Sequence, residues 1–301
     1  MGIPTETVYG LAAHALDADA VVRIFEAKER PSFNPLIVHV HDSSQFEKYA
    51  VQVPDRIYNL AEKFSPGPIT FILPRKSLIP DIVVSGGDTV ALRIPNHPLT
   101  LELLSVSGMP LAAPSANPFG YISPVTAAHV KEQLEGKLPY VLDGGTCSVG
   151  LESTVVSFFQ DELIVHRLGG ITLEDLKKVE PRLRTDLNLS SNPISPGQLK
   201  SHYAPRIPMI LGDIPTLMKL HESKRCAVLS FQQSYSTPNL VSSEVLSSSG
   251  DLHEAARNLF AAMRRLDATA SDLILAEEAP NNGIGMAIND RLKRAASAGN
   301  E

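Results

Sequence analysis

The feature that most constrains this chain is a short apolar strand that runs directly into a polar, proline-stiffened loop. The strand covers residues 111–113, and Pro114 ends it because proline has no N–H to donate to a strand ladder. Ser115 and Asn117 then present a hydroxyl and an amide in a loop that extends to Ser123. Ligands of α/β proteins bind where strands end in such loops. Taken alone, the loop fits an ordinary Asx or Ser turn better than a ligand-binding site. The strand and the loop together favour an α/β fold and leave a binding role open.

Strand-like and helix-like patterns alternate along the chain, which predicts two α/β domains. In the first part, short apolar runs predict strands, and longer periodic runs, one of them broken near Pro54, predict helices. The predicted strands are 36–40, 69–73, 89–95, 140–143, the later part of 148–157, and 163–168, and the predicted helices are 17–27, 45–64, 98–107, 126–134 and 172–179. From about residue 184 the composition shifts to Ser, Asn and Pro, which predicts a linker.

After the linker, three short apolar strands alternate with helices, as in a small parallel sheet. The strands are 209–211, 227–230 and 273–276, and the helices are 214–222, 252–268 and 287–298. We therefore predict a first domain at residues 1–184, a linker or lid at 185–208 and a second domain at 209–301. The charged side chains of the last helix, among them Asp290, Arg291 and Arg294, are interpreted as a solvated face.

Composition excludes several classes of protein. The formal net charge of −6 argues against broad nucleic-acid binding, and an aromatic content of 6% without Trp disfavours a base-stacking surface. No apolar run reaches the roughly 18–20 residues of a membrane helix, and the start has no basic-then-apolar leader. The two cysteines, Cys147 and Cys226, lie far apart, which favours a reducing compartment. We expect a cytoplasmic protein without a membrane partner.

Cations near strand ends are the first candidates for a binding site. Lys28 and Arg30 are two residues apart before Pro31, so an extended backbone would point both toward one ligand. By itself this pair is more typical of a solvated loop. Arg93 lies in an apolar strand and needs an anion, which an internal carboxylate or a ligand would supply equally well. His39 lies within a strand, where a lone histidine is typically structural.

Together, the polar side chains near loops form a set that suits a polyanion. The set comprises Thr7, Lys28, Arg30, His39, Arg93, Ser115, Asn117, Ser123, Ser153 and Arg167. It contains four cations and several hydroxyl or amide groups but no evident nucleophile–base–acid triad. Catalysis by positioning and electrostatics, as in phosphoryl or nucleotidyl transfer, fits this set. The sequence has no P-loop, HExxH, GxSxG or CxxC motif.

Several long blocks resemble one family. PTETVYGL, KERPSFNPLIVHV, SPGPITFIL, ALRIP, APSANPFGYISPVT, DGGTCSVGLESTVVS and RLGG occur in the order typical of the YrdC/Sua5 family, over about residues 1–180. SPGQLKSHYAP and the later α/β segment are similar to the two-domain Sua5 type. The resemblance implies a YrdC-like twisted mixed sheet with helices around a deep, basic cavity, plus a smaller Rossmann-like C-terminal α/β domain.

The resemblance also implies an activity, that of threonylcarbamoyl-AMP synthases. In that family the amine of L-threonine takes up carbon dioxide or bicarbonate, and the resulting carbamate attacks the α-phosphate of ATP. Pyrophosphate leaves, and a separate transferase complex passes the threonylcarbamoyl group to the adenosine beside the tRNA anticodon, giving t6A. The chain would thus be a nucleotidyltransferase with ATP as substrate and Mg²⁺ offsetting phosphate charge, without protein ligands to the metal.

Matching motifs carry the family's site residues onto this chain. Lys28, Arg30, Ser115 and Asn117 resemble the catalytic tetrad. Thr7, His39, Arg93 and Ser153 resemble the threonine-binding groups. The residues that resemble ATP-binding groups are Arg30, Asn34, Thr89, Ser115, Ser123, Arg167 and Tyr203, of which Tyr203, with His202, lies in a linker similar to an active-site lid.

The chain departs from the family pattern at four places. It starts at PTETVYGL, where members usually have a preceding helix and strand, so we expect an incomplete first sheet position. Phe33 stands where Asp is common, and Leu168 replaces a common Pro. The linker residues 198–201 are less basic than in many members, which predicts weaker lid contacts with phosphate.

Two other functions remain open. A YrdC-like fold presents a basic concave surface, so the chain could be an RNA-binding module, which the net charge disfavours. A relative that adenylates carbamoyl phosphate would carry additional zinc-finger and acylphosphatase-like domains, and none is visible here. The Sua5-like linker favours threonine as substrate.

Overall fold

The structure is a computed structural model that describes residues 1–31, 33–187 and 202–297. The chain forms two compact units. The first comprises Met1–Phe119, Pro124–Ser148 and Glu152–Leu199. The second comprises Lys200–Glu301 together with two short segments, Gly120–Ser123 and Val149–Leu151. The second unit thus begins before residue 209, because Tyr203 is already buried within it, and it takes up two loops that the sequence assigns to the first domain.

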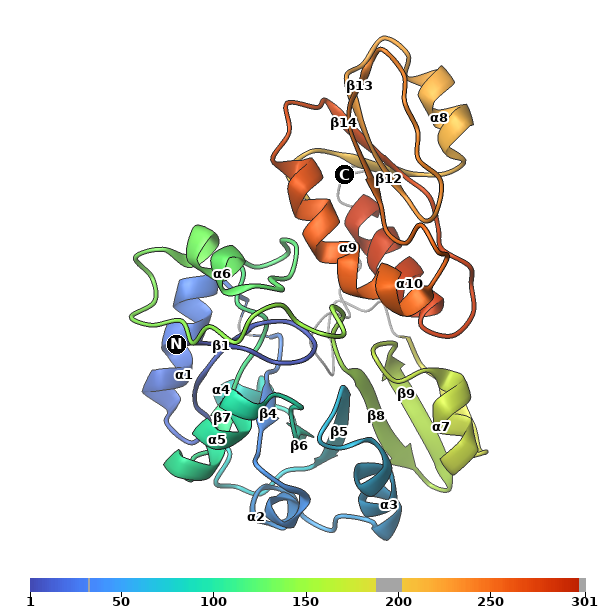
Figure 1. The fold of residues 1–301 in the computed structure, drawn as a ribbon. Coiled ribbons are helices and arrows are strands. Elements are labelled where there is room, and N and C mark those ends of the chain that lie inside the picture. The colour runs from blue at the N-terminus through green and yellow to red at the C-terminus, as the bar shows by residue number, and fades with distance from the viewer. Residues whose placement is uncertain (32, 188–201, 298–301) are drawn as a thin grey trace. The chain divides into compact units, whose positions relative to one another are not determined.

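A mixed eight-stranded sheet forms the centre of the first unit, which confirms the predicted fold class (Figure 1). Parallel and antiparallel pairs both occur, with β4 parallel to β6 and β6 antiparallel to β5. In sheet order the strands are β10 (Leu183–Thr185), β9 (Glu162–Arg167), β8 (Thr154–Phe159), β5 (Ile69–Pro74), β6 (Thr89–Arg93), β4 (Ile37–His39), β7 (Leu111–Ala112) and β3 (Ala13–His14). A separate antiparallel pair joins β1 (Gly2–Ile3) and β2 (Gly10–Leu11).

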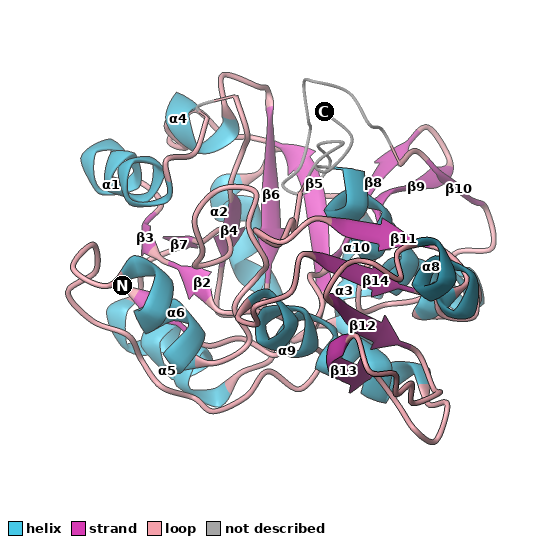
Figure 2. Cartoon of the chain, turned by 90° about the horizontal axis from the view of Figure 1, so that it is seen from above, coloured by secondary structure: helices cyan, strands magenta, loops and turns pink. Residues whose placement is uncertain are grey.

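Helices surround this sheet, and side-chain caps fix the starts of several of them. The helices are α1 (Ala18–Lys28), the 3-10 helix η1 (Ser43–Gln45), α2 (Phe46–Tyr49), α3 (Asp55–Phe64), α4 (Asp81–Val84), α5 (Pro98–Ser107), α6 (Ala127–Leu134) and α7 (Leu173–Val179). Asp17 and Thr172 accept hydrogen bonds from N–H groups of the first turns of α1 and α7, at 3.1 Å each. α1 and α4 lie side by side (Figures 1 and 2).

One predicted strand is absent. Residues 140–143 form a single bridge, between Val141 and Gly2, and Tyr140 is 73% exposed. An apolar run of this length forms a strand only where a partner strand pairs with it over several residues, and here the partner is the two-residue strand β1. The predicted break near Pro54 is confirmed, since α2 and α3 flank it.

The two faces of the first sheet differ in burial. The register places Val38, Leu92, Phe71 and Val156 on one face, and all four are fully buried. Phe46 of α2 packs edge-on against Phe71, with ring centroids 5.7 Å apart. On the opposite face Ile37, Ile72, Ala91 and Val155 form an apolar cluster, and the first three keep 6–8% of their surface exposed. The helices therefore seal the first face more completely.

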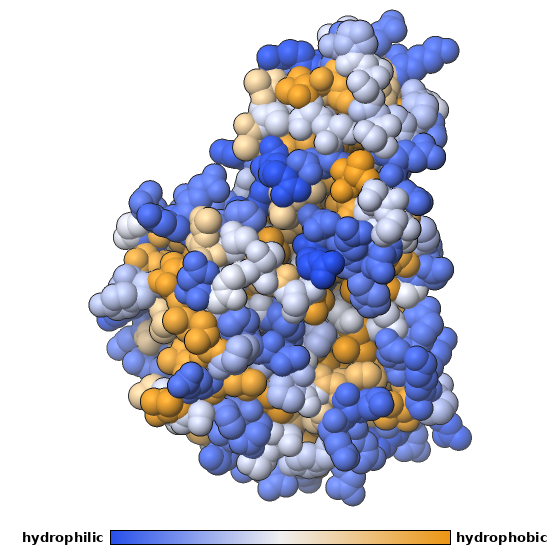
Figure 3. Space-filling model, in the orientation of Figure 1, coloured by the Kyte–Doolittle hydropathy of each residue, from blue (hydrophilic) through white to orange (hydrophobic). Residues whose placement is uncertain are grey.

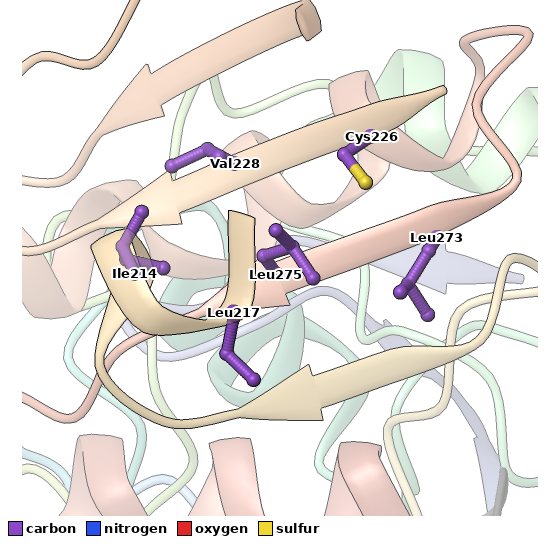
Figure 4. Close-up of a cluster of buried hydrophobic side chains, with 6 residues drawn as sticks. All are labelled: Ile214, Leu217, Cys226, Val228, Leu273 and Leu275. Atoms are coloured by element: carbon purple, nitrogen blue, oxygen red, sulfur yellow. The ribbon is translucent and has the colours of Figure 1, made fainter. Parts of the chain in front are cut away.

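The second unit is a small parallel α/β domain, as predicted. Its sheet order is β11 (Met209–Leu211), β14 (Leu273–Ala276), β12 (Cys226–Ser230) and β13 (Leu240–Val245), and every pair is parallel. α8 (Ile214–Leu220) packs on one side of this sheet, and α9 (Leu252–Asp267) and α10 (Gly285–Ala296) pack on the other (Figure 1). Figure 4 shows Ile214 and Leu217 of α8 against Val228 and Leu275 of the strands. The sequence missed β13, a half-exposed strand at the sheet edge.

The interpretation of the last helix as a solvated face is wrong for its arginines. Arg291 is fully buried and Arg294 is 4% exposed. Both donate to the carboxylate of Asp290, Arg291 through Nη1 at 2.9 Å and Arg294 through Nε at 3.0 Å. The guanidinium carbon of Arg291 also lies 5.4 Å from the ring centroid of Tyr203. These partners offset the cost of removing two positive charges from water.

The surface drawn in Figure 3 is mostly hydrophilic, with small apolar patches between charged side chains. Two large exposed apolar residues, Val106 and Met109, lie at the C-terminal end of α5. Within the described residues, no helix combines the length and the apolar character needed to cross a bilayer.

Candidate functional site

Strand register brings predicted site residues onto one face of the first sheet. His39 of β4 pairs with Arg93 of β6, and Val155 of β8 pairs with both Thr70 and Arg167. Because side chains alternate between faces, these polar groups project on the same side as the apolar cluster of Ile37, Ile72, Ala91 and Val155. We call this side of the sheet the polar-ended face.

Arg93 is held by an internal ion pair. Its Nη2 donates to Glu6 Oε1 at 2.6 Å, its Nη1 to Thr7 Oγ1 at 2.9 Å and its Nε to the carbonyl of Gly67 at 3.3 Å. Glu6 also accepts from the N–H of Asn96 at 2.9 Å. Of the two anions that the sequence left open, the internal carboxylate is therefore present. Sequence reasoning missed Glu6, although it directly precedes the predicted site residue Thr7.

His39 is neutral at physiological pH. It is 2% exposed, and its Nδ1 makes no hydrogen bond to another described residue. Burial, reinforced by the positive charge of Arg93, lowers the pKa of His39 to about 3. The imidazole beside Arg93 can therefore exchange hydrogen bonds with a ligand without adding charge.

Ser153 connects two strands at the same face. Its hydroxyl lies 2.7 Å from that of Thr70 and accepts from Arg167 Nη2 at 3.0 Å. Arg167 also donates to the carbonyl of Ser153, through Nε at 3.0 Å and Nη2 at 2.8 Å. Arg167, predicted to bind nucleotide, is thus bonded to Ser153, predicted to bind threonine. Sequence reasoning missed Thr70, which lies in an otherwise apolar strand.

Lys28 anchors the polar loop that follows β7. It is the last residue of α1 and is 1% exposed, and its Nζ donates to the carbonyls of Ser115, at 2.6 Å, and Asn117. Burial and the charge of Arg30 lower its pKa well below the usual value. The prediction that Lys28 and Arg30 share an extended segment is wrong, because Lys28 is helical and Glu29 is left-handed, with φ 55°.

Arg30 nevertheless reaches the same loop. Its guanidinium carbon lies 5.9 Å from the ring centroid of Phe119, and Nε and Nη2 donate to the carbonyls of Asn34 and Pro35 at 3.2 and 3.0 Å. The side chain of Asn34 is fully buried, and neither of its amide atoms has a hydrogen-bond partner among the described residues. A buried amide without partners is costly unless a ligand satisfies it.

The predicted groups occupy two ends of the polar-ended face. Thr89 begins β6 and Arg93 ends it, so the two lie about 13 Å apart at the usual strand rise. Thr89 is exposed, whereas Arg93 is buried with its Thr7 partner. β7 runs antiparallel to β4 toward Pro35, so Ser115 lies toward the Thr89 end. Within the first unit, the threonine-binding and nucleotide-binding predictions thus separate along the strands, apart from Arg167.

Ser123 and Tyr203 belong to the second unit. Ser123 is fully buried, and its carbonyl accepts from Arg264 Nε at 3.3 Å. Tyr203 is 1% exposed and stacks on Phe260, with ring centroids 5.5 Å apart. His202 lies edge-on to Tyr203 at 4.2 Å. The linker residues 198–201 lie outside the described residues.

A cage for a metal ion is not formed by the residues that the structure describes, because no three His, Cys, Asp or Glu side chains among them converge. Mg²⁺ commonly relies on substrate phosphates and water for most of its ligands. The described residues thus offer cations and hydrogen-bond donors to an anionic ligand and do not supply a set of metal ligands.

The fold and this arrangement define an α/β protein with charged and polar side chains gathered on one face of its first sheet. Residues 1–169 match the Sua5/YciO/YrdC family, which is described as "Telomere recombination". Residues 171–297 match a second family described as "Threonylcarbamoyl-AMP synthase, C-terminal domain". The chain belongs to the Sua5/YciO/YrdC family, in its two-domain form.

Relatives match over nearly the whole chain. A protein of Pyrococcus abyssi (strain GE5 / Orsay) named threonylcarbamoyl-AMP synthase is 39% identical, over 98% of this chain and 89% of its own length. One of the same name from Bacillus subtilis (strain 168) is 41% identical with the same coverage. The crystal structure of P. abyssi Sua5 complexed with L-threonine has a TM-score of 0.93 and 38% identity, and the match covers 99% of this chain and 90% of that one.

Proposed function

We propose that this protein makes L-threonylcarbamoyl-adenylate from L-threonine, bicarbonate or carbon dioxide, and ATP. The observation that carries the proposal is that four side chains, those of Thr7, His39, Arg93 and Ser153, meet at one face of the sheet. His39 is in register with Arg93, and Thr7 accepts a hydrogen bond from Arg93. Ser153 is hydrogen-bonded to Thr70 of the same face. These four side chains are the ones that resemble the family's threonine-binding groups. A P. abyssi relative with a TM-score of 0.93 was crystallised with L-threonine, which supports the same ligand here.

The threonine end would recognise a carboxylate. A guanidinium carries five N–H donors, and the contacts to Glu6, Thr7 and Gly67 use three of those of Arg93. Two donors thus remain, among the described residues, for the carboxylate of threonine. Glu6 balances the charge of Arg93 before substrate binds, and neutral His39 would accept or donate a hydrogen bond.

The other end would hold the phosphates. Arg30, Asn34 and Thr89, with Ser115, are the nucleotide-binding candidates there, and the unpartnered amide of Asn34 fits a hydrogen-bonding ligand. Lys28 would act by holding the loop that presents Ser115 and Asn117. The remaining nucleotide candidates are Arg167, Ser123 and Tyr203. Mg²⁺ arriving with ATP would offset phosphate charge.

The proposed reaction is nucleotidyl transfer. The nitrogen of threonine adds to carbon dioxide and loses a proton, which gives a carbamate. A carbamate oxygen then attacks the α-phosphorus of ATP, and the bond to the β-phosphate oxygen breaks, which releases pyrophosphate. The chain's residues orient the carbamate and the phosphate and stabilise the developing charge. The adenylate would pass to a tRNA-modifying transferase complex for t6A synthesis in the cytoplasm.

The direct test follows pyrophosphate and the adenylate in a mixture of ATP, Mg²⁺, bicarbonate and threonine. We expect product only when both threonine and bicarbonate are present. ATP binding without turnover, or turnover independent of threonine, would contradict the proposed reaction. A competition experiment tests the alternative that the chain is an RNA-binding module. We expect added RNA to leave ATP binding unchanged.

Variants at the loop test the site assignment. We expect Arg30→Ala and Lys28→Met to reduce adenylate formation by at least about 100-fold, a common effect of losing a positioning or charge-stabilising group. Lys137→Met is a matched control. Lys137 is exposed, and its Nζ lies 3.0 Å from the carboxylate of Glu29, the residue that follows Lys28 in the sequence. Near-normal rates in folded Arg30→Ala and Lys28→Met proteins would overturn the assignment.

A further inference from the structure

The last turn of α9 binds a loop that is distant in sequence. Arg264 donates through Nε to the carbonyl of Ser123 at 3.3 Å and through Nη2 to the carbonyl of Ile122. Its guanidinium carbon also lies 5.3 Å from the ring centroid of Tyr121. Arg264 is 8% exposed. A buried arginine donating to two consecutive carbonyls fixes the backbone path of the loop at Ser123.

Asp267, one helical turn further on, joins this loop to a second segment. Its side chain is fully buried. It accepts hydrogen bonds from the hydroxyl of Tyr121, from Arg206 Nε at 3.0 Å and from the N–H of Ile207 at 2.9 Å. One carboxylate therefore holds the loop 120–123 and the segment 204–207 together.

The two segments also contact each other directly. The N–H of Ala204 donates to the carbonyl of Gly120 at 2.8 Å, and Tyr121 and Ala204 form a parallel bridge. Ala204 follows Tyr203, whose ring stacks on Phe260 of α9. The same helix thus fixes both segments that carry the nucleotide-binding candidates of the second unit, Ser123 and Tyr203.

We propose that Arg264 and Asp267 are positioning residues for ATP, because they hold Ser123 and Tyr203 in a fixed relation to each other. The inference rests on the proposed function, and it concerns only segments that lie within the second unit. The carboxylate of Asp267 and the donating nitrogens of Arg264 form hydrogen bonds to other groups of the protein. Both residues therefore act through the segments that they hold in place.

Two variants remove this link without removing a predicted ligand-binding residue. Asp267→Asn takes away the charge that Arg206, Ile207 and Tyr121 share, and Tyr121→Phe deletes one hydroxyl. Arg265→Gln is the matched control, because Arg265 follows Arg264 on α9 but pairs with Glu244 at the surface, at 2.7–2.8 Å. Calorimetric titration of each full-length protein with ATP and, separately, with threonine gives the two dissociation constants.

We expect Asp267→Asn to weaken ATP binding about tenfold, the effect of losing one hydrogen bond to a charged group. We expect Tyr121→Phe to weaken it by a few-fold, and threonine affinity to stay within about twofold in both, a selectivity that general destabilisation would not produce. Circular dichroism establishes that each variant is folded at the titration temperature. If Asp267→Asn does not fold, Tyr121→Phe decides.

Unchanged ATP affinity in a folded variant, or an equal loss for ATP and threonine, would overturn the inference. The proposed function fails by a different result, the absence of adenylate product from the wild-type protein. In that case the ATP titrations still decide the role of α9. A wild-type protein that does not bind ATP would overturn both.

Discussion

At the scale of single residues, charge pairing decides how the polar-ended face can work. Arg93 and Glu6 bury opposite charges 2.6 Å apart, so their net charge is close to zero before a ligand arrives. His39, beside Arg93, adds no charge because burial holds it neutral. The face can therefore remain folded without a bound anion and still offer donors to one.

The neutral state of His39 predicts a specific pH dependence of stability. Its pKa is about 3 in the folded chain and near 6.5 when unfolded, so the unfolded chain binds more protons between these values. This contribution to the free energy of unfolding is fully present above pH 6.5 and is lost as pH falls from 6.5 toward 3. The loss is about 1.4 kcal/mol per pH unit, or about 2 kcal/mol by about pH 5.

Urea titrations of wild-type protein and His39→Gln at about pH 7 and about pH 5 measure this effect. We expect the variant to lose about 2 kcal/mol less than the wild type on acidification. Equal losses in the two proteins would mean that His39 takes up a proton in the folded state.

At the scale of elements, the sequence predicts helices and strands correctly where neighbouring residues determine them. α5 begins at Pro98 and ends just before Gly108, and Thr172 caps α7. The short apolar runs at β5 and β14 are strands. The predictions that failed concern segments whose structure depends on partner strands. Residues 140–143 have strand-like composition without an adequate partner strand, and the half-exposed β13 is a strand because β12 lies beside it.

The same distinction applies to the candidate site. Sequence blocks pointed to Arg93 and Ser153, but Glu6 and Thr70 became partners only when strands and loops far apart in the sequence came together. Arg291 looked like a surface residue because its partner ring, Tyr203, is 88 positions away in the sequence (291 − 203). Pairings of this kind have no local signal for a single sequence to reveal.

The cap of α7 gives a prediction at this scale. Thr172 Oγ1 accepts from the N–H of Asp175 at 3.1 Å and donates to its carboxylate at 2.8 Å. We expect Thr172→Ala to cost about 1 kcal/mol, which lowers the Tm by about 2–4 °C for a unit of this size. Thr172→Ser keeps the hydroxyl and should melt within about a degree of the wild type. If alanine and serine variants melt together, the cap does not contribute.

At the scale of the whole molecule, each unit contains one buried free thiol. Cys147 lies in the first unit and is 3% exposed, and Cys226 lies in the second and is 5% exposed. Burial, followed by the charge of Glu6, raises the pKa of Cys147 to about 12, and burial also raises the pKa of Cys226. Both thiols are therefore poorly reactive until their own unit opens.

Labelling with a thiol reagent at neutral pH should then report on the two units separately. We expect both cysteines to react at least about 100-fold more slowly in the native protein than in concentrated guanidinium chloride. In the Cys147→Ser variant only Cys226 can be labelled, so the labelling rate reports on the opening of the second unit alone. Immediate labelling of either thiol in native protein would show that its unit opens freely.

The bond between Arg264 and Ser123 spans 141 positions in the sequence. Since ribosomes add about 5–20 residues per second, the nascent loop waits on the order of ten seconds before its arginine is synthesised. The strands that precede the loop have that time to assemble, whereas the path of residues 120–123 is completed only when α9 emerges. A helix that is translated late thus completes a segment that was translated 141 positions earlier.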